Sequence, residues 1–215
     1  MKSTGLPFLA RVAIVTIMFQ SAAFAIERPI PGLDGTDGGS LETGQSLPHL
    51  DIREGGEIYV GENSIVKMPW SSKSFESTDK VQFVQYVAAD RGAVSQNKMF
   101  TDALKKKQYS AEELETTIIV HMADTISLAK GIVLKKMASK KAANQSINFV
   151  IDDMGVGLER WGMKNKSSAV IVLDASGKVL FAKDGPLSET EVENAIRLID
   201  QYKPQKAPET EKTPS

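Results

Sequence analysis

Two short polar segments carry the side chains best suited to chemistry. Asp90 and Arg91 follow one apolar run directly, and Ser167 and Ser168 stand at the start of another. An arginine supported by serine hydroxyls can hold a carboxylate or a carbonyl oxygen by charge-assisted hydrogen bonds. Amides at a helix start near Ser95 could help to bind an anion. The simpler alternative is that Asp90 and Ser95 are turn or capping residues and that Arg91 is a solvated loop charge.

Several other residues suggest chemistry, and each has a simpler structural explanation. His121 and Asp124 could belong to a serine triad, but the chain has no Gly-x-Ser-x-Gly elbow, so a histidine at a strand end beside an aspartate helix cap is favoured. Asp152 and Asp153 could hold a metal, but a turn is the favoured interpretation. The remaining candidates are interpreted as packing aromatics and a loop ion pair: Trp70 and Trp161, and Lys183 with Asp184.

The composition excludes much familiar chemistry. The 215 residues include 26 Lys and Arg against 27 Asp and Glu, a formal net charge of −1 that disfavours a general nucleic-acid binder. With no cysteine, a disulfide framework, a thiol nucleophile and a cysteine-ligated metal are excluded. Two histidines are too few for a typical zinc site. We therefore expect neither a metal nor a cofactor.

The start of the chain is typical of a secretory signal peptide. Lys2 and Arg11 precede the apolar run Val12–Phe19, and a small-x-small pattern ends at Ala25. We expect cleavage after Ala25, because the apolar run is too short to span a bilayer comfortably as an uncleaved anchor. Cleavage removes two basic and no acidic residues. The mature chain should contain no membrane span and should reside in the periplasm.

Changes in composition divide the chain into four parts. After the signal peptide (1–25), residues 26–44 are rich in glycine and are expected to form a flexible leader. The Asp34–Gly39 stretch lacks the ligand spacing of an EF-hand calcium loop. A single domain follows over 45–203, and the proline-containing end, 204–215, is expected to be a disordered tail.

Periodicity and turn residues predict the elements of this domain. The expected helices cover 97–108 and 125–142, the latter with Ile126, Ala129, Val133 and Met137 on one side. A last helix begins at Ser188, where Glu191 completes a capping box. A helical turn is expected over 155–161. The expected strands are, in chain order, 57–60, 81–87, 116–120, 148–152, 169–173 and 179–182.

This order is that of the thioredoxin-like fold. A parallel β-α-β unit is followed by a β-hairpin and a closing helix, which predicts an α/β three-layer sandwich with a central mixed sheet of 4–5 strands flanked by helices. By this analogy 81–87 is the central strand. It should lie between 116–120 and an antiparallel 169–173.

Five strings carry a more specific resemblance: LETGQSLP (41–48), VQYVAADRGAVSQN (84–97), ETTIIV (115–120), FVIDDMGVGLERW (149–161) and SSAVIVLDASGKVLFAKDGPLS (167–188). Together they resemble the YtfJ family of exported, thioredoxin-like bacterial proteins. The resemblance implies a periplasmic thioredoxin-like protein, and it implies no activity, because that family has no established reaction. Some members carry a transcriptional-regulator label, which the export signal and the acidic mature chain disfavour here.

Redox members of the fold carry a Cys-x-x-Cys pair after the central strand, faced by a cis-proline. The matching positions here are residues 88–93 and about Ser168, and neither thiol nor proline is present. Thiol-disulfide exchange and thiol peroxidase activity are therefore excluded.

Three hypotheses of function remain open. We favour a non-catalytic periplasmic module that binds a protein or small ligand through Asp90, Arg91, Ser167 and Ser168. The first rival is a cysteine-independent enzyme that uses carboxylates or Arg91 at the same face. The second is an envelope scaffold that contacts partners through its leader and tail.

Overall fold

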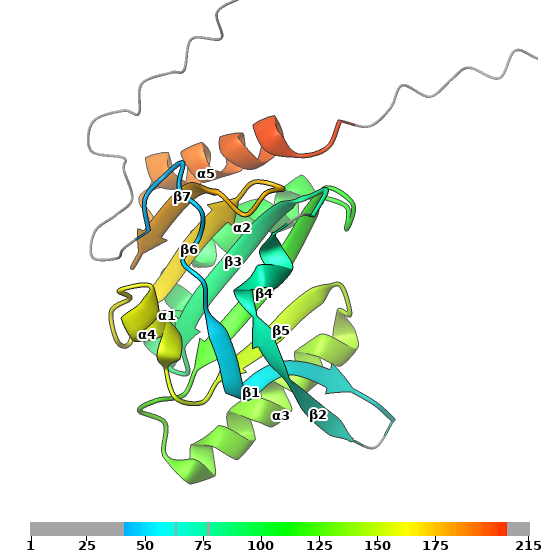
Figure 1. Ribbon diagram of the computed structural model, residues 1–215, viewed down its shortest axis with the longest axis vertical. Coiled ribbons are helices and arrows are strands. Elements are labelled where there is room, and N and C mark those ends of the chain that lie inside the picture. Colours follow the sequence, from blue (N-terminus) through cyan, green and yellow to red (C-terminus); the bar gives the residue numbers. More distant parts are fainter. Residues whose placement is uncertain (1–40, 63, 77, 206–215) are drawn as a thin grey trace, which may run out of the picture.

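A mixed sheet of seven strands, in the order β2-β1-β5-β4-β3-β6-β7, organises the domain (Figure 1). The computed structural model describes residues 41–205 apart from Asn63 and Ser77. The expected signal peptide and most of the leader and tail lie outside the described residues. The elements are β1 (Asp51–Val60), β2 (Ile65–Ser71), the 3-10 turn η1 (Ser72–Phe75), β3 (Val81–Ala88), α1 (Arg91–Gln96), α2 (Lys98–Lys107), β4 (Leu114–His121), α3 (Ser127–Ala143), β5 (Ile147–Asp152), α4 (Val156–Arg160), β6 (Ser168–Leu173), β7 (Val179–Asp184) and α5 (Glu189–Tyr202).

The three central strands confirm the predicted arrangement. β3 pairs with β4 in parallel and with β6 antiparallel. All eight residues of β3 are buried, as expected for an apolar, β-branched run covered on both faces. A β6–β7 hairpin and α5 follow, and Ser188 and Glu191 form the expected capping box. The chain has a thioredoxin-like α/β fold.

The sheet has more strands than the predicted four or five. β2 was not expected, and β1 is ten residues long where only 57–60 was predicted. Gly55 and Gly56 explain the difference, because they interrupt the alternating pattern and bend β1 so that it pairs with both β2 and β5. A Cβ atom at Gly55 would lie 2.2 Å from the Ile151 carbonyl oxygen, and one at Gly56 would lie 1.9 Å from that of Met68. Both residues have positive φ, so glycine is required at this bend.

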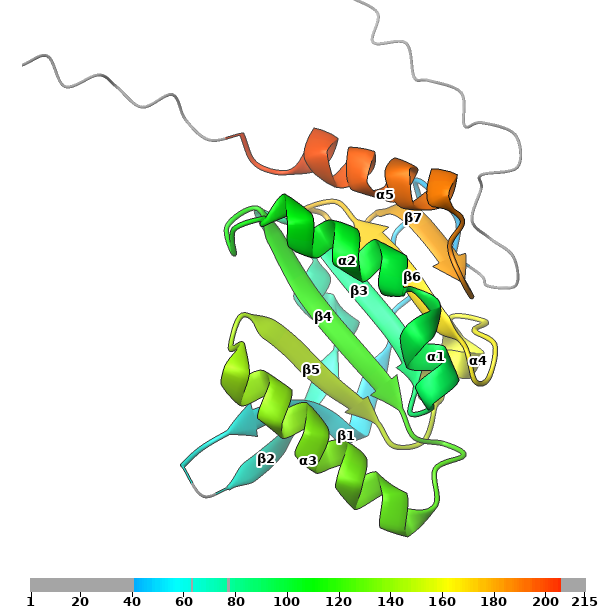
Figure 2. The ribbon, with the colours of Figure 1, turned by 180° about the vertical axis from the view of Figure 1, so that it is seen from behind.

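Helices cover one face of the sheet and irregular chain covers much of the other. Helices α1, α2, α3 and α5 lie on one face (Figure 2). The segment 41–50, η1 and α4 lie on the opposite face (Figure 1), where they share a core with Tyr86, Trp70 and Trp161. In the described part of the chain, no helix combines the length and apolarity that crossing a membrane requires.

The two edges of the sheet differ. At β7, Gly44 N donates to Val179 O at 2.8 Å and Val179 N donates to Gln45 O at 2.9 Å, so residues just before β1 partly extend the sheet. Leu41 is buried, so packed side chains already occur within the expected leader, 26–44. The opposite edge is β2, which carries Lys67 and Pro69.

Candidate functional site

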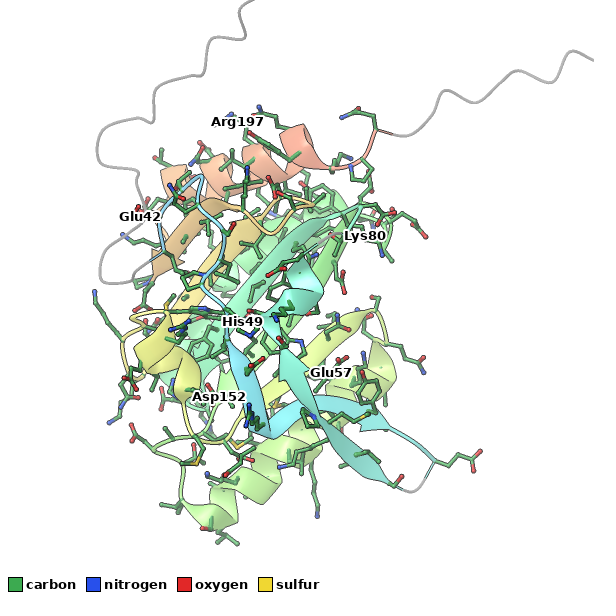
Figure 3. All side chains as sticks on the ribbon, in the orientation of Figure 1. Glu42, His49, Glu57, Lys80, Asp152 and Arg197 are labelled. Carbon is green, nitrogen blue, oxygen red and sulfur yellow. The ribbon has the colours of Figure 1, made fainter. Side chains whose placement is uncertain are left out.

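A buried polar cluster lies where the carboxyl ends of β3, β4 and β5 meet. It consists of Tyr86, His121 and Asp152, each at most 3% exposed. Register explains the meeting, because His121 pairs with Asp152 and Tyr86 pairs with Ile119, two residues before His121, so all three side chains share one face of the sheet. Figure 3 marks Asp152 at the end of the sheet near α4.

Asp152 is the centre of this cluster. Its Oδ2 accepts hydrogen bonds from Tyr86 Oη and from Gly157 N, both at 2.9 Å, and its Oδ1 accepts one from Val156 N at 2.9 Å. A carboxylate without solvent needs such donors to offset its lost hydration. Asp152 thereby holds the first turn of α4 against the sheet.

Tyr86 is held as a hydrogen-bond donor. Burial and the neighbouring Asp152 carboxylate raise the pKa of the Tyr86 phenol far above its usual range. Gly157 lies against the ring, and a Cβ atom there would be 2.4 Å from Tyr86 Cε2. Trp161 meets the same ring edge-to-face at 5.7 Å and donates from Nε1 to Pro48 O at 2.7 Å.

His121 completes the cluster by stacking. Its ring lies 5.4 Å from the Tyr86 ring at an interplanar angle of 14°. Within residues 41–205, neither ring nitrogen has a hydrogen-bond partner. Burial lowers the pKa of the imidazole, and the carboxylates of Asp152, Asp124 and Asp184 oppose this shift in part. His121 is therefore neutral at physiological pH.

This cluster is enclosed and does not form a serine triad. Asp124 accepts a hydrogen bond from Asn165 Nδ2, a loop residue, and does not cap α3 as expected, because Ile126 occupies the N-cap position. Among the described residues, no three His, Cys, Asp or Glu side chains are arranged to hold a metal ion. The cluster thus joins the sheet to α4 and its covering loop.

The four residues expected to bind a ligand lie at the same end of the sheet, and their roles differ. Asp90 caps α1, since its Oδ1 accepts from Gly92 N at 2.8 Å and from Ala93 N at 3.1 Å. Arg91 begins α1 and is exposed. In the part of the chain that the structure describes, the Arg91 guanidinium has no hydrogen bond or ion pair.

The two serines belong to the interior. Ser167 O accepts from Ala88 N at 3.0 Å, so the start of β6 does lie beside the end of β3, as predicted. Ser168 is fully buried, and its Oγ accepts from Gln85 Nε2 at 2.9 Å. Its carbonyl oxygen accepts from Asn97 Nδ2 at 2.8 Å. Ser168 therefore fixes β6 to its neighbours, and no hydrogen bond joins Arg91 to it.

The other residues considered at the sequence level have structural partners. Asp153 forms ion pairs with Lys67 at 3.0 Å and with Lys130 at 3.7 Å. Lys183 pairs with Glu191 at 3.2 Å and not with Asp184. Trp70 and Trp161 are buried packing aromatics, and Asp184 Oδ2 accepts from Lys164 N at 2.6 Å.

An open depression of about 620 Å³ lies at the opposite end of the sheet, near the β6–β7 turn. Its lining contains one carboxylate and no cluster of titratable groups: Ser46, Glu76, Thr78, Ala175 and Ser176. It offers no constellation for catalysis.

Comparisons with known proteins identify the family. A model described as "Bacterial protein of unknown function (YtfJ_HI0045)" matches residues 41–202. The chain is 34% identical over 162 residues to an uncharacterized protein of Haemophilus influenzae, which covers 75% of this chain and 86% of that protein. It is 31% identical over 159 residues to the uncharacterized protein YtfJ of Escherichia coli, which covers 74% and 85% respectively.

Among solved structures, a thiol-disulfide isomerase of Corynebacterium glutamicum is 13% identical. The match covers 75% of this chain and 97% of that chain, with a TM-score of 0.49. The family model spans every described strand and helix of the domain, and it includes Ser167 and Ser168 at the start of β6. The chain belongs to the YtfJ_HI0045 family of bacterial proteins.

Proposed function

We propose that the chain is an exported, non-catalytic binding module of the bacterial periplasm. Its binding surface lies around the start of α1, at the place where redox proteins of this fold carry their cysteines. The partner is a protein that offers a carboxylate beside an apolar side chain.

One observation carries this proposal. The Arg91 guanidinium is exposed and has no hydrogen-bond or ion-pair partner in the described range. By contrast, Asp90 and Ser168 accept hydrogen bonds from other residues of the domain. Val94 is 50% exposed and lies three residues further on, so both side chains occupy one face of α1. A guanidinium next to an apolar contact suits a carboxylate on an apolar peptide segment.

The enclosed cluster supports a non-catalytic role. Tyr86, His121 and Asp152 have the chemistry of an acid-base site, but a substrate has to reach such groups within hydrogen-bond distance. All three are buried, and Asp152 already accepts from three donors. The chain also has no cysteine with which to perform thiol chemistry.

The N-terminal pattern of residues 1–25 supports export. The test is N-terminal sequencing of the protein recovered from the periplasm by osmotic shock. Ile26 as the first residue supports the proposal, and Met1 on the exported protein contradicts cleavage.

Binding can be tested in living cells with a photoreactive amino acid placed at Val94. The matched control places the same amino acid at Lys106, which is exposed near the end of α2. We expect one reproducible protein adduct from position 94, which is absent from position 106 and weakened by Arg91→Ala. Equal labelling from both positions contradicts the proposed surface. Turnover of ester or phosphate-ester substrates by the pure protein, abolished by Arg91→Ala, would instead indicate an enzyme.

A further inference from the structure

Helix α3 carries charge of a single sign. Its 17 residues include five lysines and no acidic residue, although the whole chain has a net charge of −1. Lys130 pairs with Asp153, and Lys141 donates to two backbone carbonyls. The other three lysines are exposed, and their ammonium groups have no hydrogen bond or ion pair with any residue that the structure describes: Lys135, Lys136 and Lys140.

The same helix exposes large apolar side chains. Leu128 is 81% exposed and Ile132 is 66% exposed. Ile126, at the N-cap, is 72% exposed, although the sequence pattern placed it on the same side as Met137, which is buried. The loop after β5 adds Met154, 63% exposed, which follows the residue that pairs with Lys130 of α3. Four apolar side chains therefore stand at one end of α3 without cover from the described residues.

The spacing combines both features on one face. Positions 128, 132, 135 and 136 follow the i, i+4, i+7, i+8 pattern of a single helical stripe. The stripe is apolar in its first half and basic in its second. The inner side of α3 packs on the domain through Met137 and Ala138, which are buried, and through Val133 and Leu134, which are partly buried. Figure 2 shows α3 as the outer layer over β5 and β1, apart from α2 and α5.

We propose that α3 binds the surface of an anionic phospholipid bilayer. Leu128 and Ile132 enter the headgroup region, and Lys135, Lys136 and Lys140 lie against lipid phosphates. A helix with an apolar stripe and several lysines binds in the interface through buried apolar area and attraction to anionic lipid. The helix is about 25 Å long, so it can lie flat on the bilayer.

Charge selects this occupant over a second copy of the chain. Two α3 helices packed along the whole stripe would set lysines against lysines if parallel, and lysines against apolar side chains if antiparallel. Neither arrangement neutralises the unpaired charges. An anionic surface neutralises them. The proposal uses a different helix from the Arg91 surface, and either can fail without the other.

The first test is co-sedimentation of the exported protein with vesicles of phosphatidylcholine, with and without phosphatidylglycerol. We expect binding only to the anionic vesicles and loss of binding at high salt. Lys135→Glu with Lys136→Glu should weaken binding at least 25-fold, from about fivefold for each lysine near an anionic surface. Leu128→Ser with Ile132→Ser should also weaken it. The matched control, Lys105→Glu with Lys106→Glu on α2, changes the total charge by the same amount. Its affinity for the anionic vesicles should stay within about twofold of the affinity of the unaltered protein.

The second test uses the absence of cysteine from the chain, which allows a single reporter to be attached. An environment-sensitive dye on Leu128→Cys should shift to the blue with anionic vesicles, and the same dye on Val66→Cys of β2 should not. Circular dichroism checks that each variant is folded. Failure to sediment with anionic vesicles, equal binding to neutral vesicles, or full binding by the Lys135/Lys136 variant overturns the proposal. A dimer in sedimentation equilibrium that Leu128→Ser abolishes would also overturn it and assign the face to a second copy.

Discussion

Tyr86 on β3 and Asp152 at the end of β5 are 66 residues apart in the chain and are joined by a hydrogen bond of 2.9 Å inside the protein. β4 lies between their strands, so this contact crosses three strands and fixes the sheet to the first turn of α4. The domain is therefore cross-linked at the end where redox proteins of this fold carry their reactive thiols.

The contact predicts graded losses of stability. Tyr86→Phe removes one donor to a buried carboxylate and should cost about 1.5–3 kcal/mol. Asp152→Ala leaves three donors without an acceptor, two of them buried and the Val156 amide partly buried, and should cost more, on the order of 4 kcal/mol. Urea unfolding followed by circular dichroism measures both. If Asp152→Ala is no less stable than Tyr86→Phe, Asp152 does not organise the cluster.

Gly157 and Gly131 form a matched pair for testing close packing. Gly157→Ala would place a methyl group 2.4 Å from Tyr86 Cε2 and should cost about 1–3 kcal/mol as overpacking. Gly131 lies within α3 with no neighbouring atom within 4 Å of an added Cβ. Gly131→Ala should therefore raise stability by up to about 1 kcal/mol, because alanine favours helix. Equal effects in thermal denaturation would show that the Tyr86 ring can move aside.

His121 makes stability depend on pH. Burial lowers its pKa in the folded protein below the ordinary histidine value of 6.5. Below that pH the unfolded chain therefore binds a proton that the folded chain does not. The free energy of unfolding should be at its full value above pH 6.5. It should fall as the pH drops from 6.5 toward the lowered pKa of the folded state. The measurement is urea unfolding across pH 5 to 8. This range includes the pKa of free histidine, which is about 6.5.

Replacement of each histidine identifies the source of this pH dependence. His121→Phe keeps a ring against Tyr86 and should flatten the profile in the acid range. His49→Asn changes a partly exposed histidine that pairs with Asp51 and should retain the loss of stability. A slope that persists in His121→Phe would assign it to other groups.

Arg91→Ala separates binding from folding. The side chain is exposed and has no partner in the described range, so the melting temperature should stay nearly the same. Partner capture should weaken by about 1.5–3 kcal/mol, the usual contribution of a hydrogen bond to a charged group. A lowered melting temperature with unchanged capture would make Arg91 a structural residue.

Local pattern was sufficient to predict the central fold. The apolar run of β3, the hairpin around Gly177 and the capping box at Ser188 each depend on neighbouring residues, and all three are confirmed. β1 and β2 were missed in part because their pairing depends on the bend at Gly55 and Gly56, which interrupts the alternation of side chains. Ile126 fits the apolar side of a helix, but this pattern does not show whether the sheet extends far enough to cover the residue, and Ile126 is exposed.

The polar cluster was only partly visible in the sequence. His121 and Asp152 could be recognised as the last residues of neighbouring parallel strands, a signal that places their side chains together. Tyr86 lies within β3 and gave no such signal, because its role depends on the return of α4 over the sheet. Ser168 was expected at a surface, and its burial follows from Gln85 and Asn97, which are distant in sequence.

The two edges of the sheet are protected in different ways, and this protection affects the solubility of the protein. Unpaired strand edges can add strands from other molecules and start aggregation. At β7 the segment around Gly44 already occupies part of these hydrogen-bonding positions. At β2, Pro69 lacks an amide donor and Lys67 adds charge, two features that discourage a further strand. A protein that lost residues 41–47 would keep its central sheet but expose β7, and such a truncated protein should polymerise through that edge.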